Sequence, residues 1–281
     1  MPIHFGIIGG DARQIYLAKS LKQDGHTVYL SGLEKAPGTE GFEHVPPEEL
    51  GVLCEAVVLP LPVTKDGKTL NAPFAGAPVE IGERFARSLS GCKVLGGMTQ
   101  RLPRLIAWET LAPIDYYTRD ELVAGNAVLT AEAALGLAIQ EFPGALNGAR
   151  CLVTGFGRIG KSLCGMLRSL AAEVDCAARK KLDFMMIQNM GCRPVAYPEI
   201  RERYDIIFNT VPATVLSEQQ LAFQDQDTIL IELASAPGGI DLQAAAKYGV
   251  RVVDGQSLPG RVSPKTAGEY IKQTICNILE E

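Results

Sequence analysis

The sequence predicts an α/β protein with two parallel-sheet lobes and a cleft between them. Short apolar runs alternate with helical patterns along the chain, which is typical of βα units in a parallel sheet. A second series of these units starts halfway down the chain, with the glycine-rich turn VTGFGRIG. The chain has 281 residues, 47% of them hydrophobic and 21% charged, so it can bury two domain cores.

The first lobe is predicted over residues 1–125, with the apolar runs IHFGIIGG, HTVYLSG, CEAVVLPLP and KVLGGM. A connecting helix is predicted over residues 126–144, mainly from the apolar pattern NAVLTAEAALGLAIQEF. The second lobe, residues 145–263, has the runs RCLVTGFG, AEVDCAA, RPVAYP, YDIIFNTVP, TILIELAS and VRVVDGQ. The final pattern, SPKTAGEYIKQTICNILEE, predicts a helix over residues 264–281 that packs back on the first lobe.

The turn in the second lobe has the spacing of a dinucleotide-binding fingerprint. Gly155, Gly157 and Gly160 form G-x-G-x-x-G between an apolar strand and a helical pattern. In a Rossmann-like lobe the first glycine makes the turn, the second lets a pyrophosphate approach, and the third allows close helix packing. The alternative is a purely structural turn. The predicted cofactor-binding residues are Gly155, Phe156, Gly157, Arg158, Ile159, Gly160, Arg179, Lys180, Thr210, Val211 and Pro212.

The segment AARKK, residues 177–181, predicts NADP rather than NAD as the cofactor. A carboxylate usually ends this strand and holds the adenosine ribose, but here the strand ends on Ala178, followed by Arg179. Arginine offers a planar donor fork to a 2′-phosphate, and alanine removes the repulsion. Asp175, the nearest acid, falls within the strand. The alternative is that the basic residues only solvate the start of a helix.

The overall charge and the termini limit the partners. A net charge of −5 argues against nucleic acid or an anionic membrane as the main partner. No positively charged leader precedes the first apolar run, and we expect no run long enough to span a membrane, so the prediction is a cytoplasmic protein. The seven cysteines are expected to be reduced packing residues, with no metal site.

The first lobe is predicted to hold the substrate. Its own glycine turn, GIIGGDARQ, does not complete the fingerprint, and Asp11 would repel a phosphate. Arg13 follows as a fork for a carboxylate. The later strand ends PLPVT, at residues 60–64, and GGMTQR, at residues 96–101 with Thr99, could complete the pocket.

The residue types restrict the chemistry. All three histidines lie within the first 44 residues, so the second lobe lacks an acid/base histidine of the kind that hydroxy-acid dehydrogenases use. No local signature of a serine or cysteine nucleophile is present. Hydride transfer without a protein base is feasible when the oxidation is strongly favourable, and an aromatising dehydrogenation meets that condition.

The whole chain resembles the A chain of bacterial dipicolinate synthases. The similar segments are GGDARQ, PLP at residues 60–62, NAVLTAEAAL, VTGFGRIG, NTVPA, ELAS-PGGID and LPGRVSPKTAG. GFGRIG is shared with many dehydrogenases, whereas GGDARQ, ELAS-PGGID and LPGRVSPKTAG together are much more specific. The resemblance implies NADP-linked oxidation of a dihydro- or hydroxytetrahydrodipicolinate in the mother cell of a sporulating bacterium. It also implies a partner, the flavoprotein-like B chain of dipicolinate synthase.

A substrate with two carboxylates needs cationic or amide donors at both ends. The predicted substrate-binding residues are Arg13, Thr99, Arg261 and Lys265, although Arg261 and Lys265 could equally be solvated loop charges. Asp11 is the candidate proton acceptor, or it orients Arg13, so both are predicted catalytic residues. We also expect an oligomer. Two alternatives remain: a dehydrogenase of another small carboxylate, and a nucleotide-binding protein that is not catalytic by itself.

Overall fold

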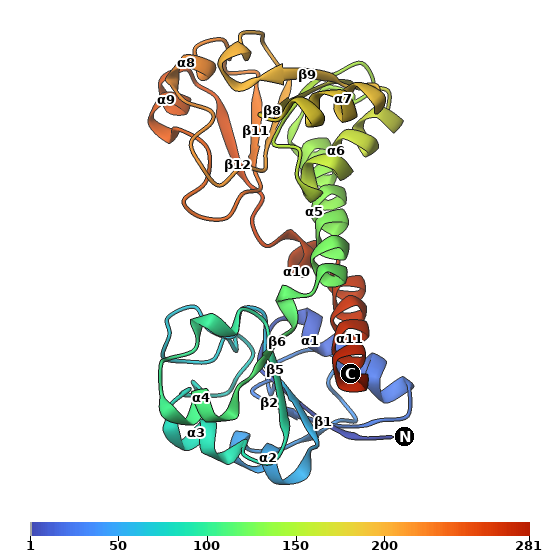
Figure 1. Cartoon of the computed structure of the whole chain (residues 1–281), viewed down its shortest axis with the longest axis vertical. Helices are drawn as coiled ribbons and strands as arrows, with labels where there is room; N and C mark the ends of the chain where they lie inside the picture. The colour runs from blue at the N-terminus through green and yellow to red at the C-terminus, as the bar shows by residue number, and fades with distance from the viewer. Residues whose placement is uncertain (1) are drawn as a thin grey trace. The chain divides into compact units, whose positions relative to one another are not determined.

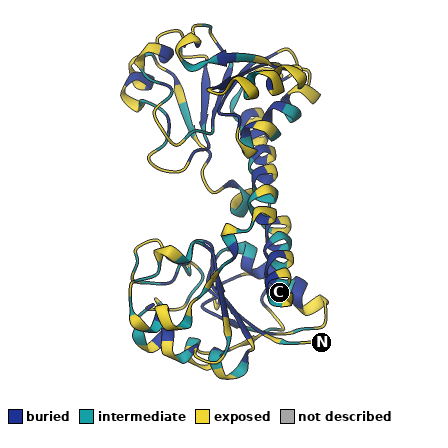
Figure 2. Cartoon of the chain, in the orientation of Figure 1, coloured by how far each residue is buried: buried dark blue, intermediate teal, exposed yellow. Residues whose placement is uncertain are grey.

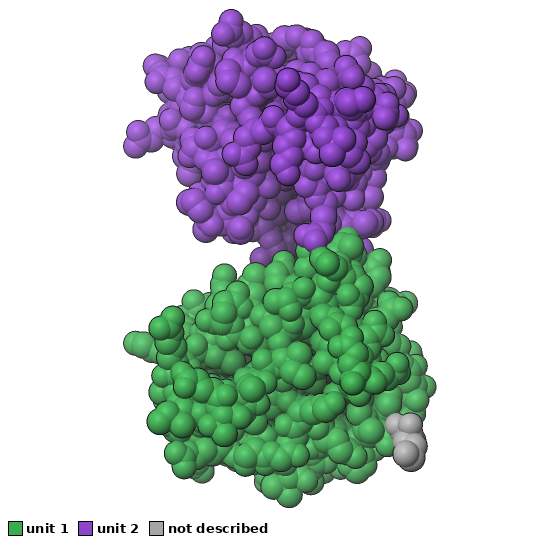
Figure 3. Space-filling model, in the orientation of Figure 1, with its two compact units in different colours: residues 1–126, 263–281 green, residues 127–262 purple. Residues whose placement is uncertain are grey.

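The computed structural model describes residues 2–281, and its chain divides into two compact units. Unit 1 comprises residues 1–126 and 263–281, and unit 2 comprises residues 127–262 (Figure 3). Each unit contains one six-stranded sheet in which all pairings between strands are parallel. The predicted fold class, two lobes with parallel sheets, is therefore confirmed.

Unit 1 has the strand order β3-β2-β1-β4-β5-β6, and β1, β2, β5 and β6 are labelled in Figure 1. The strands are β1 His4–Ile8, β2 Thr27–Ser31, β3 Glu43–His44, β4 Ala56–Val58, β5 Lys93–Gly96 and β6 Ile114–Asp115. The helices are α1 Ala12–Gln23, α2 Leu50–Leu53, α3 Glu83–Ser88, α4 Ile106–Leu111 and α11 Pro264–Glu280, with 3-10 turns η1 Pro47–Glu49, η2 Thr99–Arg101 and η3 Tyr116–Thr118. Helices α1 and α11 cover one face of the sheet, and α2 to α4 cover the other.

Helix α11 lies alongside α1 and joins the core of unit 1. Ile271, Ile275 and Ile278 of α11 share a buried cluster with Ile15 and Leu17 of α1. The close approach depends on Gly268, because a Cβ there would lie 2.7 Å from the carbonyl oxygen of Arg13. The C-terminal segment is thus an integral layer of the first lobe.

Unit 2 repeats the same order, as β9-β8-β7-β10-β11-β12. The strands are β7 Arg150–Thr154, β8 Glu173–Ala178, β9 Arg193–Ala196, β10 Ile206–Asn209, β11 Ile229–Glu232 and β12 Arg251–Asp254. The helices are α6 Arg158–Ser169, α7 Lys181–Asn189, α8 Glu218–Leu221, α9 Leu242–Lys247 and α10 Leu258–Val262, with the 3-10 turn η4 Tyr197–Glu199. The strands are mostly buried, as expected for a sheet covered on both faces (Figure 2).

Helix α5, Asp120–Glu141, contains the boundary between the units and differs from the expectation in two ways. It begins six residues before the predicted connecting helix, in the more polar segment DELVAG. It also has the length and composition of a membrane span, which we did not expect. Half of the most apolar 18-residue stretch of α5 is buried inside the protein. Ala131, Ala134 and Ala138 belong to the core of unit 2, so α5 packs as a core helix.

Candidate functional site

The fingerprint turn connects β7 to α6, and two of its glycines are required by the packing of the chain itself. Gly155 has a φ of +94°, and a Cβ there would lie 2.5 Å from Thr210 Oγ1 and 2.8 Å from Val211 Cγ2. A Cβ at Gly160 would overlap the carbonyl oxygen of Gly155. Because neither residue has a side chain, the start of α6 can lie close to the ends of β7 and β10.

Gly157 is different, because a Cβ there would meet no protein atom within 4 Å. This exposed residue precedes α6 and supplies no side-chain cap, and Arg158 and Ile159 begin the helix. An open surface at the start of a helix suits a pyrophosphate, because helix N-terminal amides and the helix dipole favour negative charge. Phe156, 8% exposed, packs beneath the turn with the rest of the core. The turn therefore fits a dinucleotide.

The ribose position at the end of β8 has no carboxylate. Ala178 is buried as the last residue of the strand, and Arg179 and Lys180 are exposed just before α7. Asp175 is 8% exposed inside the strand, where it accepts hydrogen bonds from Arg193 Nε at 2.8 Å and Tyr204 Oη at 2.7 Å. Burial, and then the bond to Asp175, raise the pKa of Tyr204. Asp175 is thus part of the structural core.

The ends of β7, β10 and β11 are joined by a polar chain that we call the strand-end network: Thr154, Asn209 and Glu232. Thr154 Oγ1 donates to Asn209 Oδ1 at 2.5 Å, and Asn209 Nδ2 donates to Glu232 Oε1 at 2.7 Å. Thr154 and Asn209 are fully buried. Thr154 was not among the predicted site residues, whereas Asn209 and Glu232 begin the strand-end segments NTVPA and ELASAP, which the sequence predicts to line the nicotinamide side of the site.

The predicted residues Thr210, Val211 and Pro212 follow this network. Thr210 Oγ1 donates to the carbonyl oxygen of Thr154 at 2.7 Å, and the Val211 amide donates to Asn209 Oδ1 at 3.2 Å. Pro212 is exposed. The first two residues are thereby held beside Gly155, at the point between β7 and β10 where the strand order reverses and ligands bind in such sheets.

The glycine turn of unit 1 is occupied by the protein itself. The Gly10 amide donates to the carbonyl oxygen of Asn71 at 2.7 Å. A Cβ at Gly9 would lie 3.0 Å from both Leu70 and Ala72. The loop that contains residues 70–72 therefore packs directly against the glycine turn of unit 1.

Asp11 and Arg13 lie together at the start of α1. Arg13 Nε donates to Asp11 Oδ1 at 2.9 Å and Nη2 donates to Oδ2 at 2.8 Å, while Nη2 also reaches the carbonyl oxygen of Leu61 at 2.6 Å. Burial, the largest single effect, would lower the pKa of Arg13, but its hydrogen bond to Asp11 and the Coulombic effects of Asp11, Tyr116 and Tyr117 together outweigh burial and raise the pKa. The guanidinium is therefore a fixed cation, and no hydrogen bond of its Nη1 is described within residues 2–281.

Thr99 is held in the same unit by Asp115, the last residue of β6. Asp115 Oδ2 accepts the amide of Thr99 at 2.9 Å, and Oδ1 accepts the amides of Met98 at 3.1 Å and Tyr117 at 2.9 Å. Met98 has a φ of +61°, so this carboxylate supports a strained turn. Asp115 was not predicted, because its partners lie 16 and 17 residues away in the sequence.

The segment LPGRVSPKTAG forms α10 and the start of α11, with Ser263 between the two helices. Arg261 is exposed in α10, and its Nη1 donates to the carbonyl oxygen of Gln256 at 3.3 Å. Lys265 is exposed in the first turn of α11, three residues before Gly268, and belongs to unit 1. Ser263 is the cap residue of that helix.

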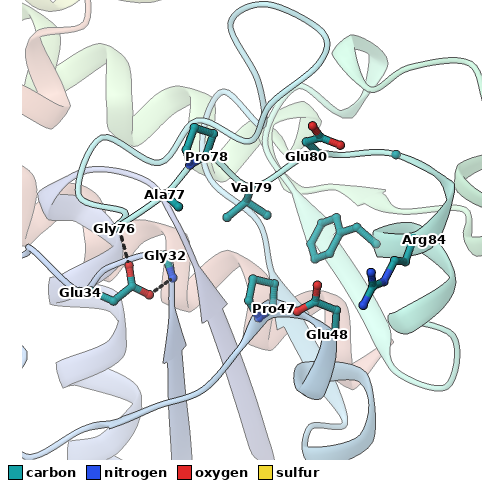
Figure 4. Close-up of a pocket in the computed structure, with 12 residues that line it drawn as sticks. Gly32, Glu34, Pro47, Glu48, Gly76, Ala77, Pro78, Val79, Glu80 and Arg84 are labelled. Carbon is teal, nitrogen blue, oxygen red and sulfur yellow. Dashed lines mark hydrogen bonds between the residues drawn. The ribbon is translucent and has the colours of Figure 1, made fainter.

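A pocket of about 580 Å³ lies in unit 1, and none of the predicted site residues lines it (Figure 4). Its lining includes Gly32, Glu34, Val79 and Arg84. Glu34 accepts the amides of Gly32 and Gly76, each at 2.8 Å. Burial opposes ionisation of Glu34, but hydrogen bonds from the backbone amides of Gly76, Glu34 and Gly32, together with the Coulombic effect of His44, outweigh burial and lower its pKa. The Glu34 carboxylate therefore links two loop segments through its hydrogen bonds, so its oxygens already have partners in the protein.

Comparison with known proteins finds a matching family model for each half of the chain. Residues 4–117 match the family model for the N-terminal domain of the dipicolinate synthase A chain, and residues 118–238 match that for the D-isomer specific 2-hydroxyacid dehydrogenase, NAD binding domain. The chain is 27% identical to the dipicolinate synthase A chain of Bacillus subtilis (strain 168), across 99% of this chain and 96% of that protein.

Two solved structures agree with these matches. The dipicolinate synthase A chain of Bacillus subtilis has a TM-score of 0.84 and 26% identity, over 100% of this chain and 96% of its own. The corresponding dipicolinate synthase chain of Bacillus halodurans has a TM-score of 0.86 and 29% identity, over 99% and 98%. The resemblance found in the sequence is confirmed.

Proposed function

We propose, from the premise that the chain is an NAD(P)-dependent oxidoreductase similar over its whole length to the dipicolinate synthase A chain, that it oxidises a dihydropyridine dicarboxylate to dipicolinate with NADP. The observation that carries this proposal is the pairing of that full-length similarity with an open Gly157 turn in unit 2. The nucleotide domain provides the oxidant's site, and the N-terminal domain, through its match to dipicolinate synthases, provides the substrate class.

The choice of NADP rests on the end of β8. The strand ends on buried Ala178, and exposed Arg179 and Lys180 follow it, so cationic donors are present where a ribose-binding acid would stand. A 2′-phosphate there gains charge-assisted hydrogen bonds, whereas NAD gains none of them.

In the substrate lobe, Arg13 is the first candidate to bind a carboxylate. It is held by Asp11 and the Leu61 carbonyl, which leaves the two Nη1 hydrogens for a ligand. Thr99, Arg261 and Lys265 are the further candidates for the dicarboxylate. We assign Asp11 the orienting role in preference to that of proton acceptor, because its carboxylate already accepts the Arg13 backbone and side-chain N–H groups.

The proposed chemistry needs little from the protein beyond binding and orientation. If the substrate carries a 4-hydroxyl, loss of water gives the dihydropyridine. That ring then loses a hydride from carbon and a proton to water or a nearby group, which leaves the aromatic pyridine. Bound NADP supplies the hydride acceptor, and aromatic stabilisation makes the oxidation favourable.

We further propose that the chain acts in the cytoplasm of a sporulating cell with the flavoprotein-like B chain of dipicolinate synthase, and that it is oligomeric. Two other functions compete: oxidation of another small carboxylate, and nucleotide binding without catalysis. The second is favoured by one observation: the only carboxylate predicted to accept a proton, Asp11, is already in an ion pair.

A coupled assay tests the proposal. The chain, with and without the synthase B chain, is given freshly prepared dihydrodipicolinate precursor and either NADP or NAD, and the reduced nicotinamide and the pyridine product are followed together. Matched appearance of both with NADP supports the proposal. Tight NADP binding without turnover, with both kinds of chain present, contradicts it and favours one of the two competing functions.

A further inference from the structure

Glu232, at the end of β11, is a carboxylate without a cationic partner. Its Oε1 accepts Asn209 Nδ2 at 2.7 Å and the Ala234 amide at 2.9 Å, and its Oε2 accepts the Gly239 amide at 2.9 Å. All three donors are uncharged. Within residues 2–281, no described ion pair involves Glu232. The negative charge is therefore stabilised by dipoles but is not cancelled.

The same contacts give the carboxylate a fixed position. The loop of residues 234–239 packs on the loop that follows β10, because a Cβ at Gly239 would lie 2.5 Å from Asn209 Nδ2 and 3.0 Å from the Ala213 carbonyl oxygen. Asn209 is in turn fixed by buried Thr154. The strand-end network thus holds Glu232 between two loops at the carboxyl edge of the sheet.

This edge lies in the half of unit 2 that should take the nicotinamide. In a sheet of this order the two halves of a dinucleotide lie on either side of the reversal point, here between β7 and β10. The ribose-binding position after β8 assigns the adenosine to the β8 and β9 side. Glu232 lies on the opposite side, with β10 to β12.

We infer that Glu232 sets the redox preference of the nucleotide site, favouring the oxidised nicotinamide, which carries a positive charge, over the neutral reduced form. The inference rests on the proposed function only in requiring a nicotinamide dinucleotide in unit 2. A fixed, uncompensated carboxylate attracts the cationic ring and has no such effect on the neutral one. A site of this kind binds its oxidant and releases the reduced product, as a dehydrogenation requires.

The test measures the dissociation constants of oxidised and reduced NADP, without substrate, for the wild-type chain and Glu232→Gln at low salt. We expect the ratio of the reduced to the oxidised constant to fall about five- to tenfold in the variant, on the order of one charge interaction over several ångströms. Glu232→Asp, which keeps the charge, should retain most of the wild-type ratio. If the substitution acts only by removing hydrogen bonds, Glu232→Gln should weaken the binding of oxidised and reduced NADP equally. That result overturns the inference.

Glu173→Gln is the matched control. Glu173 is an exposed carboxylate at the first residue of β8, so it lies where the strands of this sheet begin, whereas Glu232 lies where they end. The ratio in Glu173→Gln should stay at the wild-type value. An equal shift in this control would attribute the effect to net charge and overturn the assignment.

If Glu232→Gln does not fold, Ser235→Lys replaces it as the test, with Ser235→Gln as its control. Ser235 is exposed in the loop that Glu232 holds, so the lysine brings a compensating cation without touching the network. The ratio should fall in the lysine variant alone, and an unchanged ratio overturns the inference. Failure of the wild-type chain to bind either form of NAD or NADP would instead contradict the proposed function.

Discussion

Asp11 and Arg13 form a two-point ion pair in which Arg13 Nε and Nη2 lie 2.9 and 2.8 Å from the two carboxylate oxygens. Asp11 also caps α1 by accepting the Arg13 amide at 3.1 Å. One carboxylate therefore starts the helix and sets the direction of its second side chain. These two functions can be separated by substitution.

Asp11→Asn should keep the cap and lose the charge that fixes Arg13, since asparagine is an equally good cap residue. We expect a raised KM for the dicarboxylate with a small change in kcat, measured by steady-state kinetics. Asp11→Ala should lose about 1 kcal/mol of stability as well. A large fall in kcat at unchanged KM would identify Asp11 as the proton acceptor, and undiminished turnover in Asp11→Ala would remove it from the mechanism.

Arg179→Asp should weaken NADP more than NAD, by about 2–4 kcal/mol of binding free energy, because charge-assisted bonds are lost and repulsion is added. Calorimetric titration of each cofactor measures the two changes. Arg201→Asp, an exposed arginine of the same unit, makes the same charge change as a control. Equal losses of affinity for both cofactors would contradict the 2′-phosphate assignment.

Gly157→Ala and Gly160→Ala should affect different properties: nucleotide affinity in the first and folding stability in the second. A methyl at Gly160 overlaps the Gly155 carbonyl oxygen, so unfolding should become easier by about 2 kcal/mol or more. A methyl at Gly157 meets no protein atom and its φ of −80° suits alanine, so stability should change by only about 0.5 kcal/mol. Nucleotide affinity should nevertheless fall in Gly157→Ala. Unchanged affinity would mean that no phosphate approaches this residue.

Glu34 should give unit 1 an acid-sensitive stability. Its pKa is lowered from the ordinary value of 4.5, since the backbone amides of Gly76, Glu34 and Gly32 and the Coulombic effect of His44 together outweigh the effect of burial. A depressed pKa adds stability that is present above 4.5 and disappears as pH falls through the folded-state pKa. The stability difference between wild type and Glu34→Gln should therefore shrink on acidification below that value. Thermal melts across this range measure it, and a constant difference would refute the linkage.

Much of this arrangement could be predicted from local patterns. Alternation of apolar runs and helical patterns identified the two parallel sheets, and the spacing of Gly155, Gly157 and Gly160 identified the turn before α6. These signals are local because a strand, a turn and a helix start each depend on neighbouring residues. The helical start at Pro264 was also visible, since proline suits the first turn of a helix.

Other parts depend on contacts between distant segments. Asp115 supports the Met98 turn, and Asn209 reaches Glu232 across 23 residues, and neither pairing has a sequence pattern. The segment LPGRV contains proline and glycine, which favour turns, yet it forms α10. Helix α5 extends into a polar segment in which Leu122 is buried in the core of unit 1.

The Asn71 segment in unit 1 affects the number of nucleotides that each chain should bind. Both units share one strand order and a glycine turn after the first strand, but the Gly10 amide in unit 1 is already bonded to the chain's own carbonyl group. The carbonyl group of Asn71 therefore takes a hydrogen bond that a bound ligand would otherwise accept. A titration with nucleotide should therefore saturate at one equivalent per chain, although both units have the same strand order.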